Sequence, residues 1–522
     1  MPHATITDHL NRSTFPAAAL FAAVFAGALA LTLGLRVPGF IHHDTSEAVM
    51  WGHSGWAAGF WKHPPLLPWI TRAWSYLLPL SAFSLALLTA LNMTACAFFV
   101  WSIARMSPTG EVDRKDDATG KIGLLAIGLL VVVPFASVMA IKLNHNTILI
   151  SLWPLTVLTL LRAIDRPTFL RGVLFGLAAA AAVLAKYYSL LLLAGCIAAS
   201  FAVPARAWSF YQRPAPYAAF ATFLLAMAPH LAWMLDRAST PLGYAFKAGA
   251  SNPVSATRGP AMALTFAMQA PLLLLPMLLV AWLIWRSHQP VAVKHGSTSI
   301  GHRHERALVL LAVVPYVLTI ILVFVFHLRG AVAWAMPLFV CLPAAIAARI
   351  GTFPERLSRI APCLALAAVV IAVIAGQIGA RIGVARGVDG ISEPRREIAE
   401  AATALWHATQ PGPLPIVAGD QRLASAAVIF SPDHPQGWPS FSLAQAPWID
   451  PVLAKRDGFI GLCRTADTQC IELATKTAPD RAVRCTIKRR VEYLGAKGPW
   501  FEAIIFIAPP VASTVVPVCP AG

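Results

Sequence analysis

The sequence predicts an α-helical membrane protein that crosses the bilayer about eleven times and carries a small α/β domain at its C-terminal end. Of its 522 residues, 57% are hydrophobic and only 12% are charged, whereas about 25% are charged in an ordinary soluble domain. The mean hydropathy is +0.65. Because so few charges cannot cover the surface of a soluble protein of this size, the composition excludes a soluble enzyme, a disordered chain and a fibre.

The predicted spans are apolar runs with the length that a membrane helix needs, about 17–25 residues. They comprise residues 15–35, 82–104, 122–141, 147–164, 169–185, 187–204, 216–235, 260–285, 307–326, 330–348 and 360–382. No small-residue cleavage site follows the first run, so we expect a retained span and not a removed signal peptide.

The loops between these runs alternate between two kinds. One kind is rich in Arg and Lys, and its members include Arg12, Arg105, Arg166, Arg213, Arg286 and Arg349. The positive-inside rule assigns these loops to the cytoplasm. The same rule explains most of the net charge of +17, with an anionic lipid substrate as a second contributor, so no nucleic-acid partner is expected. The other loops, and everything after the eleventh span, then lie outside.

Residues 387–522 form the second predicted domain, after a transmembrane domain of residues 1–386. Gly and Pro flank short apolar pieces such as Pro415–Ala418 and Gly458–Leu462, which is typical of strands. A helix is expected near Glu393–Thr409. Four of the eight cysteines lie in this domain, and an oxidising compartment would favour disulfides among them, with the pairing left open: Cys463, Cys470, Cys485 and Cys519.

The first outer loop holds the most informative residues. Asp44 and Glu47 are three apart, so a helix there places both carboxylates on one face. Lys62 comes shortly before a Pro-Pro step, which holds the backbone extended and presents a cation rigidly. Trp51 and Trp56 are suited to the membrane–water interface. The alternative is an ordinary amphipathic surface helix with solvated acids, followed by a lysine that snorkels to the interface.

Other polar residues fall at the same, outer ends of the predicted spans. A polar residue at a helix end is explained by contact with water alone, but His and Asn gather here while the opposite ends carry mostly Arg and Lys. We therefore predict that these residues share a cavity at the outer face with the acids and the lysine of the first outer loop: Asp44, Glu47, Lys62, His63, Asn144, His145, Lys186, Tyr187, His230, Asp236, Arg237, His327 and Arg329.

The segment Asp44–Ala48, followed by Gly59–Trp69, resembles the first outer loop of the polyprenol-phosphate-dependent glycosyltransferases of the GT-C superfamily. These include protein O-mannosyltransferases and aminoarabinose transferases. Lys142–Asn146, Ala185–Tyr188 and Pro229–Trp233 resemble further pieces of that family, in the same order. The resemblance implies transfer of a sugar from a polyprenyl-phosphate donor to a lipid, glycan or protein acceptor, with inversion, on the periplasmic side of a bacterial inner membrane.

The resemblance also implies roles for the outer residues. Asp44 is the first choice for a general base and Glu47 the second. Lys62, Arg329 and then Lys186 are expected to stabilise the charge on the leaving phosphate. The remaining outer residues are expected to bind substrate: His63, Asn144, His145, Asn146, Tyr187 and His230. Many relatives have Asp in the turn where this chain has Asn144 or Asn146, so no metal ligand is assigned and a divalent cation is left open.

A secondary transporter is the alternative from another functional class, because eleven or twelve spans suit one. Transporters place ionisable residues near the bilayer midplane and show paired repeats. In this sequence the middles of the spans are apolar and no internal repeat is found. A non-catalytic membrane scaffold would leave Asp44, Glu47 and Lys62 without a role.

Overall fold

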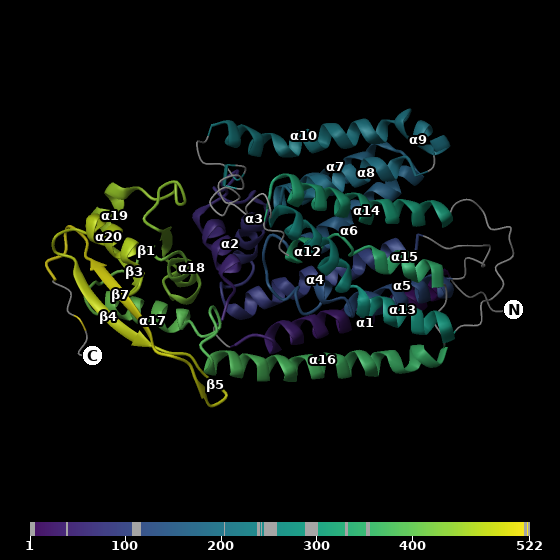
Figure 1. Cartoon of the computed structure of the whole chain (residues 1–522). Helices are drawn as coiled ribbons and strands as arrows, with labels where there is room; N and C mark the ends of the chain where they lie inside the picture. Colours follow the sequence, from purple (N-terminus) through teal and green to yellow (C-terminus); the bar gives the residue numbers. More distant parts are fainter. Residues whose placement is uncertain are drawn as a thin grey trace.

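The computed structural model shows a bundle of helices with a sheet domain at one end (Figure 1). It describes residues 6–37, 40–106, 116–202, 204–236, 241, 243–244, 258–287, 301–328, 332–350, 355–515 and 519. The helices of the bundle are α1 (Ile6–Gly34), α4 (Ala82–Ala104), α5 (Asp116–Val131), α6 (Leu149–Asp165), α7 (Phe169–Ala185), α8 (Ser189–Ser200), α9 (Pro204–Tyr211), α10 (Pro214–Leu235), α12 (Arg258–Leu272), α13 (Leu275–Ser287), α14 (Gly301–Val325), α15 (Leu342–Ile350) and α16 (Glu355–Ala385).

The predicted class of fold, a multi-span helical protein with a small C-terminal α/β domain, is confirmed. Within the described residues, six stretches are long and apolar enough to cross a membrane, and the shorter apolar helices add Gly120–Val131, Phe169–Ala185 and Ser189–Ser200. The number of eleven spans stays a prediction.

Three predicted spans are interrupted in the structure, each beside a proline. The span 260–285 is divided between α12 and α13. Pro271 has no N–H for the carbonyl of Ala267, which instead accepts the hydroxyl proton of Tyr316. The spans 122–141 and 330–348 are partly short turns, including η1 (Pro134–Ala136) and η2 (Val332–Ala335). In the second of these, hydrogen bonds three residues apart surround Pro337, and α15 follows.

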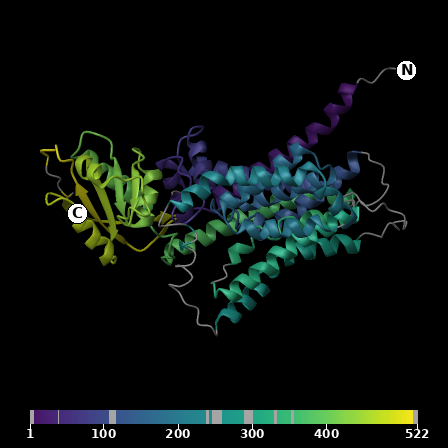
Figure 2. The ribbon, with the colours of Figure 1, turned by 90° about the horizontal axis from the view of Figure 1, so that it is seen from above.

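The two ends of the bundle differ, as the alternation of loops predicts. His304 lies within hydrogen-bond distance of the carbonyl of Met106 and of Asp165, so three of the predicted cytoplasmic segments meet. Helix α1 runs from that end toward the sheet domain, and α16 lies beside it and leads into the domain (Figures 1 and 2). We call the end that carries the sheet domain the outer end.

Two short helices, α2 (His43–Ser54) and α3 (Leu66–Ser75), lie between the bundle and the sheet domain. The imidazole of His42 caps α2 by accepting the N–H of Asp44, and α3 starts directly after the Pro-Pro step. The predicted helix around Asp44 is therefore confirmed. The interfacial role predicted for Trp51 is wrong, because this side chain is 0% exposed and stacks on Phe60.

The sheet domain has the element order α17 (Arg395–His407), β1 (Ile416–Gly419), α18 (Gln421–Phe430), β2 (Gln436–Pro439), α19 (Pro451–Asp457), β3 (Phe459–Arg464), α20 (Thr468–Thr477), β4 (Val483–Arg489), β5 (Glu492–Tyr493), β6 (Ala496–Lys497) and β7 (Phe501–Ala508). The strand order of its main sheet is β2-β1-β3-β7-β4, and the pairs of β1 are parallel while those of β7 are antiparallel. Val417, Ile460 and Ile505 lie in its core. The predicted helix and strands of this domain are confirmed.

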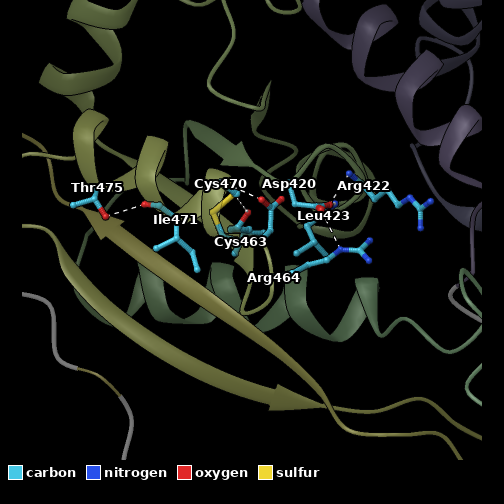
Figure 3. Close-up of a disulfide and its surroundings, with 10 residues drawn as sticks. Asp420, Arg422, Leu423, Cys463, Arg464, Cys470, Ile471 and Thr475 are labelled. Carbon is cyan, nitrogen blue, oxygen red and sulfur yellow. Dashed lines mark hydrogen bonds and ion pairs between the residues drawn. A yellow bond between two sulfur atoms is a disulfide. The ribbon is translucent and has the colours of Figure 1, made fainter. Parts of the chain in front are cut away.

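The four cysteines of the sheet domain form the expected disulfides, paired as Cys463–Cys470 and Cys485–Cys519. The first joins β3 to α20 (Figure 3). Directly after Cys463, Arg464 donates to Asp420 at 3.0 Å, and Asp420 in turn accepts two backbone N–H groups at the start of α18. The disulfide thus supports the strand that fixes the beginning of α18, the helix that contacts α2.

Helices α7 and α10 pack closely because two glycines of α7 face α10. A Cβ atom on Gly172 would lie 2.2 Å from the carbonyl oxygen of Ala215, and one on Gly176 would lie 2.3 Å from that of Ala219. Small residues four apart are a common means of close helix contact in membranes. This contact positions His230, near the outer end of α10.

Replacing Gly176 by Leu is expected to destabilise the protein by at least about 1–3 kcal/mol, the usual cost of overpacking, because the backbone of α10 would have to move. The midpoint of thermal unfolding of the detergent-solubilised protein measures the effect. G128L is the matched control, since a Cβ on Gly128 meets open space. Equal midpoints for the two variants would contradict the prediction.

Candidate active site

A cluster of polar side chains occupies the outer end of the bundle, beneath the sheet domain. It combines the start of α2, the loop between α2 and α3, the turn before α6 and the turn between α7 and α8. The hydroxyl of Thr45 on α2 donates to the carbonyl of Leu143, at 2.7 Å. This bond joins the first outer loop directly to the segment that carries Asn144, His145 and Asn146.

The centre of the cluster is the buried carboxylate of Glu47, which is 3% exposed. One oxygen accepts a hydrogen bond from Lys62 Nζ at 2.8 Å, and the other accepts one from the amide of Gln421. Burial raises the pKa of Glu47 above its usual range, although Lys62 and Gln421 act in the opposite direction. Burial also acts to lower the pKa of Lys62, but Glu47 outweighs it and the pKa is raised. The ammonium group of Lys62 therefore already forms an ion pair with Glu47 when no ligand is bound.

Asp44 is the more accessible of the two acids, since its side chain is 29% exposed. Asn144 Nδ2 donates to its carboxylate at 3.3 Å. Burial acts to raise the pKa of Asp44, but the charges of His42, His43 and Lys62 lower it overall. Asp44 is thus ionised at neutral pH and open to a ligand, as a general base must be.

Asn144, Asn146 and Lys186 form a second branch of the cluster. The side-chain oxygen of Asn144 accepts the backbone N–H groups of Asn146 and Thr147, at 2.9 and 3.0 Å, which fixes the turn. Lys186 donates to the side-chain oxygen of Asn146. Burial lowers the pKa of Lys186 to about 8, and Asp44 acts in the opposite direction. No carboxylate among the described residues pairs with this lysine.

His63 and His145 stack on each other, with ring centroids 3.9 Å apart. Burial holds the pKa of His63 well below its usual range and that of His145 at about 3, so both are neutral. His145 Nδ1 lies 2.9 Å from the carbonyl of Ala185 and therefore carries the proton. Its Nε2 is a buried acceptor that has no hydrogen-bond partner among the described residues.

Tyr187 and His230 form a separate pair beside the cluster. The tyrosine hydroxyl lies within hydrogen-bond distance of His230 Nε2, and His230 Nδ1 lies 2.6 Å from the carbonyl of Ala58. These contacts hold the loop before Lys62 in place. Arg329, the last of the predicted site residues, lies outside the described residues.

One group of metal-ligating side chains is found among the described residues, formed by His42, His43 and Asp44. Two imidazoles and one carboxylate suit a transition metal, whereas Mg²⁺ or Ca²⁺ prefers oxygen ligands. His42 Nδ1 already accepts the N–H of Asp44, and Asn144 donates to the carboxylate. The residues do not fit Mg²⁺ or Ca²⁺, and no step below depends on a metal.

The sequence analysis missed the contribution of the sheet domain to this cluster. Gln421 contacts Glu47, and Ser425 lies 3.0 Å from Ser46 through their hydroxyl oxygens. One signal was present: Asp420 and Gln421 come one residue after the predicted strand Pro415–Ala418, and polar residues at the carboxyl ends of parallel strands often serve a site.

The fold is similar to that of two solved structures. Both are of ArnT from Cupriavidus metallidurans, with 13% sequence identity and 94% of this chain covered. The structure bound to undecaprenyl phosphate matches over 97% of its own chain with a TM-score of 0.53, and the apo structure over 98% with a TM-score of 0.55. Residues 62–233 match the family described as dolichyl-phosphate-mannose-protein mannosyltransferase.

The expected resemblance to the GT-C glycosyltransferases is confirmed. A comparison with curated proteins finds no match. The family match begins at Lys62 and ends at Trp233, so it includes most of the cluster. It leaves out the start of α2, with Asp44 and Glu47, and the sheet domain with Gln421. The assignment of individual residues to steps of the reaction stays a proposal.

Removing one partner of the Glu47–Lys62 pair is expected to cost about 3–5 kcal/mol of stability, because a buried charge is left uncompensated. The double variant E47Q/K62M should lose less than the sum of E47Q and K62M. Denaturant titration of the solubilised protein gives the free energies of unfolding. The variant K476M, which removes the exposed contact with Glu472, should leave stability nearly unchanged. Strict additivity of the two single changes would contradict the pairing.

Proposed function

We propose that this chain transfers a sugar from a polyprenyl-phosphate carrier to an acceptor hydroxyl at the periplasmic face of a bacterial inner membrane. The observation that supports the proposal is that one cluster contains both a group that can accept a proton and a cation that can stabilise a phosphate. Asp44 is an accessible, ionised carboxylate, and Lys186 is a cation without a carboxylate partner among the described residues. The sheet domain, at the outer end, then lies in the periplasm.

The transfer is a single displacement at the sugar C1. The acceptor oxygen forms a bond to C1 as the bond between C1 and the phosphate oxygen breaks. The electron pair of the broken bond stays on the polyprenyl phosphate, and the hydroxyl proton passes to Asp44. Attack from the face opposite to the leaving phosphate inverts the anomeric centre.

Lys186 is the residue that we assign to the leaving phosphate. Negative charge grows on the phosphate as the bond breaks, so a fixed cation stabilises the transition state more than the ground state. Lys62 is the weaker choice of the two, because its ammonium group is 2.8 Å from the carboxylate of Glu47. We assign Glu47 to the support of Lys62 and α2, and Asp44 to the base.

The neighbours of Lys186 suit the sugar. The Nε2 atom of His145 is an acceptor without a hydrogen-bond partner among the described residues. The ring centroids of Tyr188 and Trp334 lie 6.0 and 5.7 Å from Lys186 Nζ. We propose that His145 accepts a hydrogen bond from a sugar hydroxyl, and that His63 holds its ring in place by stacking.

Replacing Asp44 by Asn is expected to lower the rate of transfer by about 10²–10⁴, the usual contribution of a general base. The assay follows release of polyprenyl phosphate from a labelled carrier-linked sugar in membranes that contain the protein. D457N, at an exposed aspartate of α19, is the control and should retain full activity. Full turnover by D44N would remove the assignment of the base. Uptake of a solute into vesicles, without turnover of any carrier-linked sugar, would favour a transporter.

Donor affinity is expected to fall as the pH rises from about 7 to 9. The pKa of Lys186 is about 8, so its charge is present below that pH and is lost above it, whereas the phosphodiester stays anionic throughout. Binding of the carrier-linked sugar at a series of pH values measures the effect. K186R should bind with little dependence on pH, because Arg keeps its charge. Constant affinity of the wild-type protein across this range would contradict the role of Lys186.

A further inference from the structure

A hairpin of the sheet domain extends back to the membrane helices. Strands β5 and β6 are antiparallel, with Tyr493 opposite Ala496, and a two-residue turn of Leu494 and Gly495 joins them. This β5–β6 hairpin contacts α16. Figure 1 shows it at the outer end of α16, on the side away from the rest of the bundle. The hairpin thus lies where the lipid-facing side of the bundle meets the sheet domain.

The hairpin is held in this place by contacts with α16. Val491 and Ala496 belong to one buried apolar cluster with Val384 of α16. At the turn, Arg381 Nε donates to the carbonyl of Leu494 at 3.0 Å. A membrane helix therefore sets the position of the tip.

The level of this contact along α16 places the tip at the membrane–water interface. The apolar stretch of α16 ends at Ala385 and only 6% of it is buried, so most of its side chains face the bilayer. Arg381 comes four residues before that end, or about 6 Å along the helix axis. The carbonyl of Leu494 thus lies beside the last turn of the apolar stretch, at the level of the lipid head groups.

The exposed side chains around the tip suit this layer. Leu494 is 59% exposed, and Trp500, which directly precedes β7, is 61% exposed. Tryptophan is common at the membrane–water interface. Arg386, Arg489 and Lys497 are also exposed, and none of them pairs with a carboxylate among the described residues. Lipid phosphates are suitable partners for such cations.

The turn is an unfavourable place for a leucine. Leu494 has φ 46° and Gly495 has φ 73°, and two positive φ values in a two-residue hairpin turn favour Asn, Asp or Gly at the first position. A leucine there is strained and also exposes an apolar side chain. Because its side chain is mostly exposed, packing within the protein offsets little of this cost, whereas burial in lipid would offset it.

We propose that the β5–β6 hairpin is a membrane anchor of the sheet domain. Leu494 and Trp500 enter the head-group layer beside α16, and the neighbouring cations contact lipid phosphates. The anchor attaches the domain to the bilayer at a place separate from the contact of α18 with α2. The inference does not depend on the function proposed above, because it concerns how the domain is held and not what the polar cluster does.

Quenching of a fluorescent label measures the depth of the tip. The full-length protein is reconstituted in vesicles of phosphatidylethanolamine and phosphatidylglycerol, and the fluorophore NBD is attached to L494C. The substitution C363S removes the exposed free thiol, and the other three free cysteines are buried. The matched control is a label at V452C, on α19 of the sheet domain, where the native side chain is 74% exposed.

The label at position 494 is expected to lose fluorescence when the lipids carry a nitroxide on the head group, and to lose less when the nitroxide is near the end of the acyl chain. The label at position 452 should be quenched by iodide in the water and not by the lipids. Quenching of the label at position 494 by iodide alone would overturn the proposal. Quenching by neither agent would indicate that a second copy of the chain covers the tip, and would overturn it as well.

The variant L494N tests whether the leucine stabilises the contact. Asn suits the turn better than Leu, so if the tip faces water, L494N should slow the hydrogen exchange of residues 492–497 or leave it unchanged. If the tip lies in lipid, exchange in lipid nanodiscs should become about fivefold faster. This ratio corresponds to about 1 kcal/mol, roughly half of the value of fully burying a leucine.

V452N is the control for this measurement, because it makes the same kind of change at an exposed apolar residue of α19. It should leave the exchange of the hairpin unchanged. Slower or unchanged exchange of the hairpin in L494N, or an equal increase in V452N, would overturn the proposed anchor.

Discussion

The architecture of the outer end depends on the hydrogen bonds that compensate one buried carboxylate, that of Glu47. A lone ionised acid in this position would be costly, but Glu47 accepts hydrogen bonds from Lys62 and Gln421. These three residues come from α2, from the loop that follows it and from the sheet domain. The same contacts that neutralise the charge therefore hold three separate segments together, and they leave Asp44, one turn away on α2, as the accessible acid.

Much of this arrangement could be predicted because the signals are local. Each signal depends only on residues that are close together in the sequence, as the apolar runs, the spacing of Asp44 and Glu47 and the Pro-Pro step show. Burial of Trp51 could not be predicted in the same way, because it results from contact with distant segments. The pairing of Lys62 with Glu47 could not be predicted for a similar reason. Nothing in the sequence near Lys62 shows that its charge is already matched by Glu47.

The spans show a second limit, since a hydropathy pattern measures the composition of a segment and not the continuity of its hydrogen bonds. The run 260–285 is apolar throughout, yet Pro271 leaves a carbonyl of α12 without its usual donor, and Tyr316 of α14 fills the place. In the segment before α15, the apolar run is likewise not a continuous α-helix, since hydrogen bonds three residues apart surround Pro337. Such breaks allow loop-like segments at membrane depth only where protein surrounds them.

The contact between Glu47 and Gln421 spans 374 positions of the chain. During synthesis, the ribosome therefore completes the whole membrane bundle before it makes the residue that finishes the environment of Glu47. A nascent chain that is already inserted in the bilayer still lacks this amide, and α2 still lacks the helix that covers it. The environment of Glu47 is thus completed late in biogenesis, and a chain truncated ahead of α18 would contain the membrane helices yet lack one of the two side-chain donors to this carboxylate.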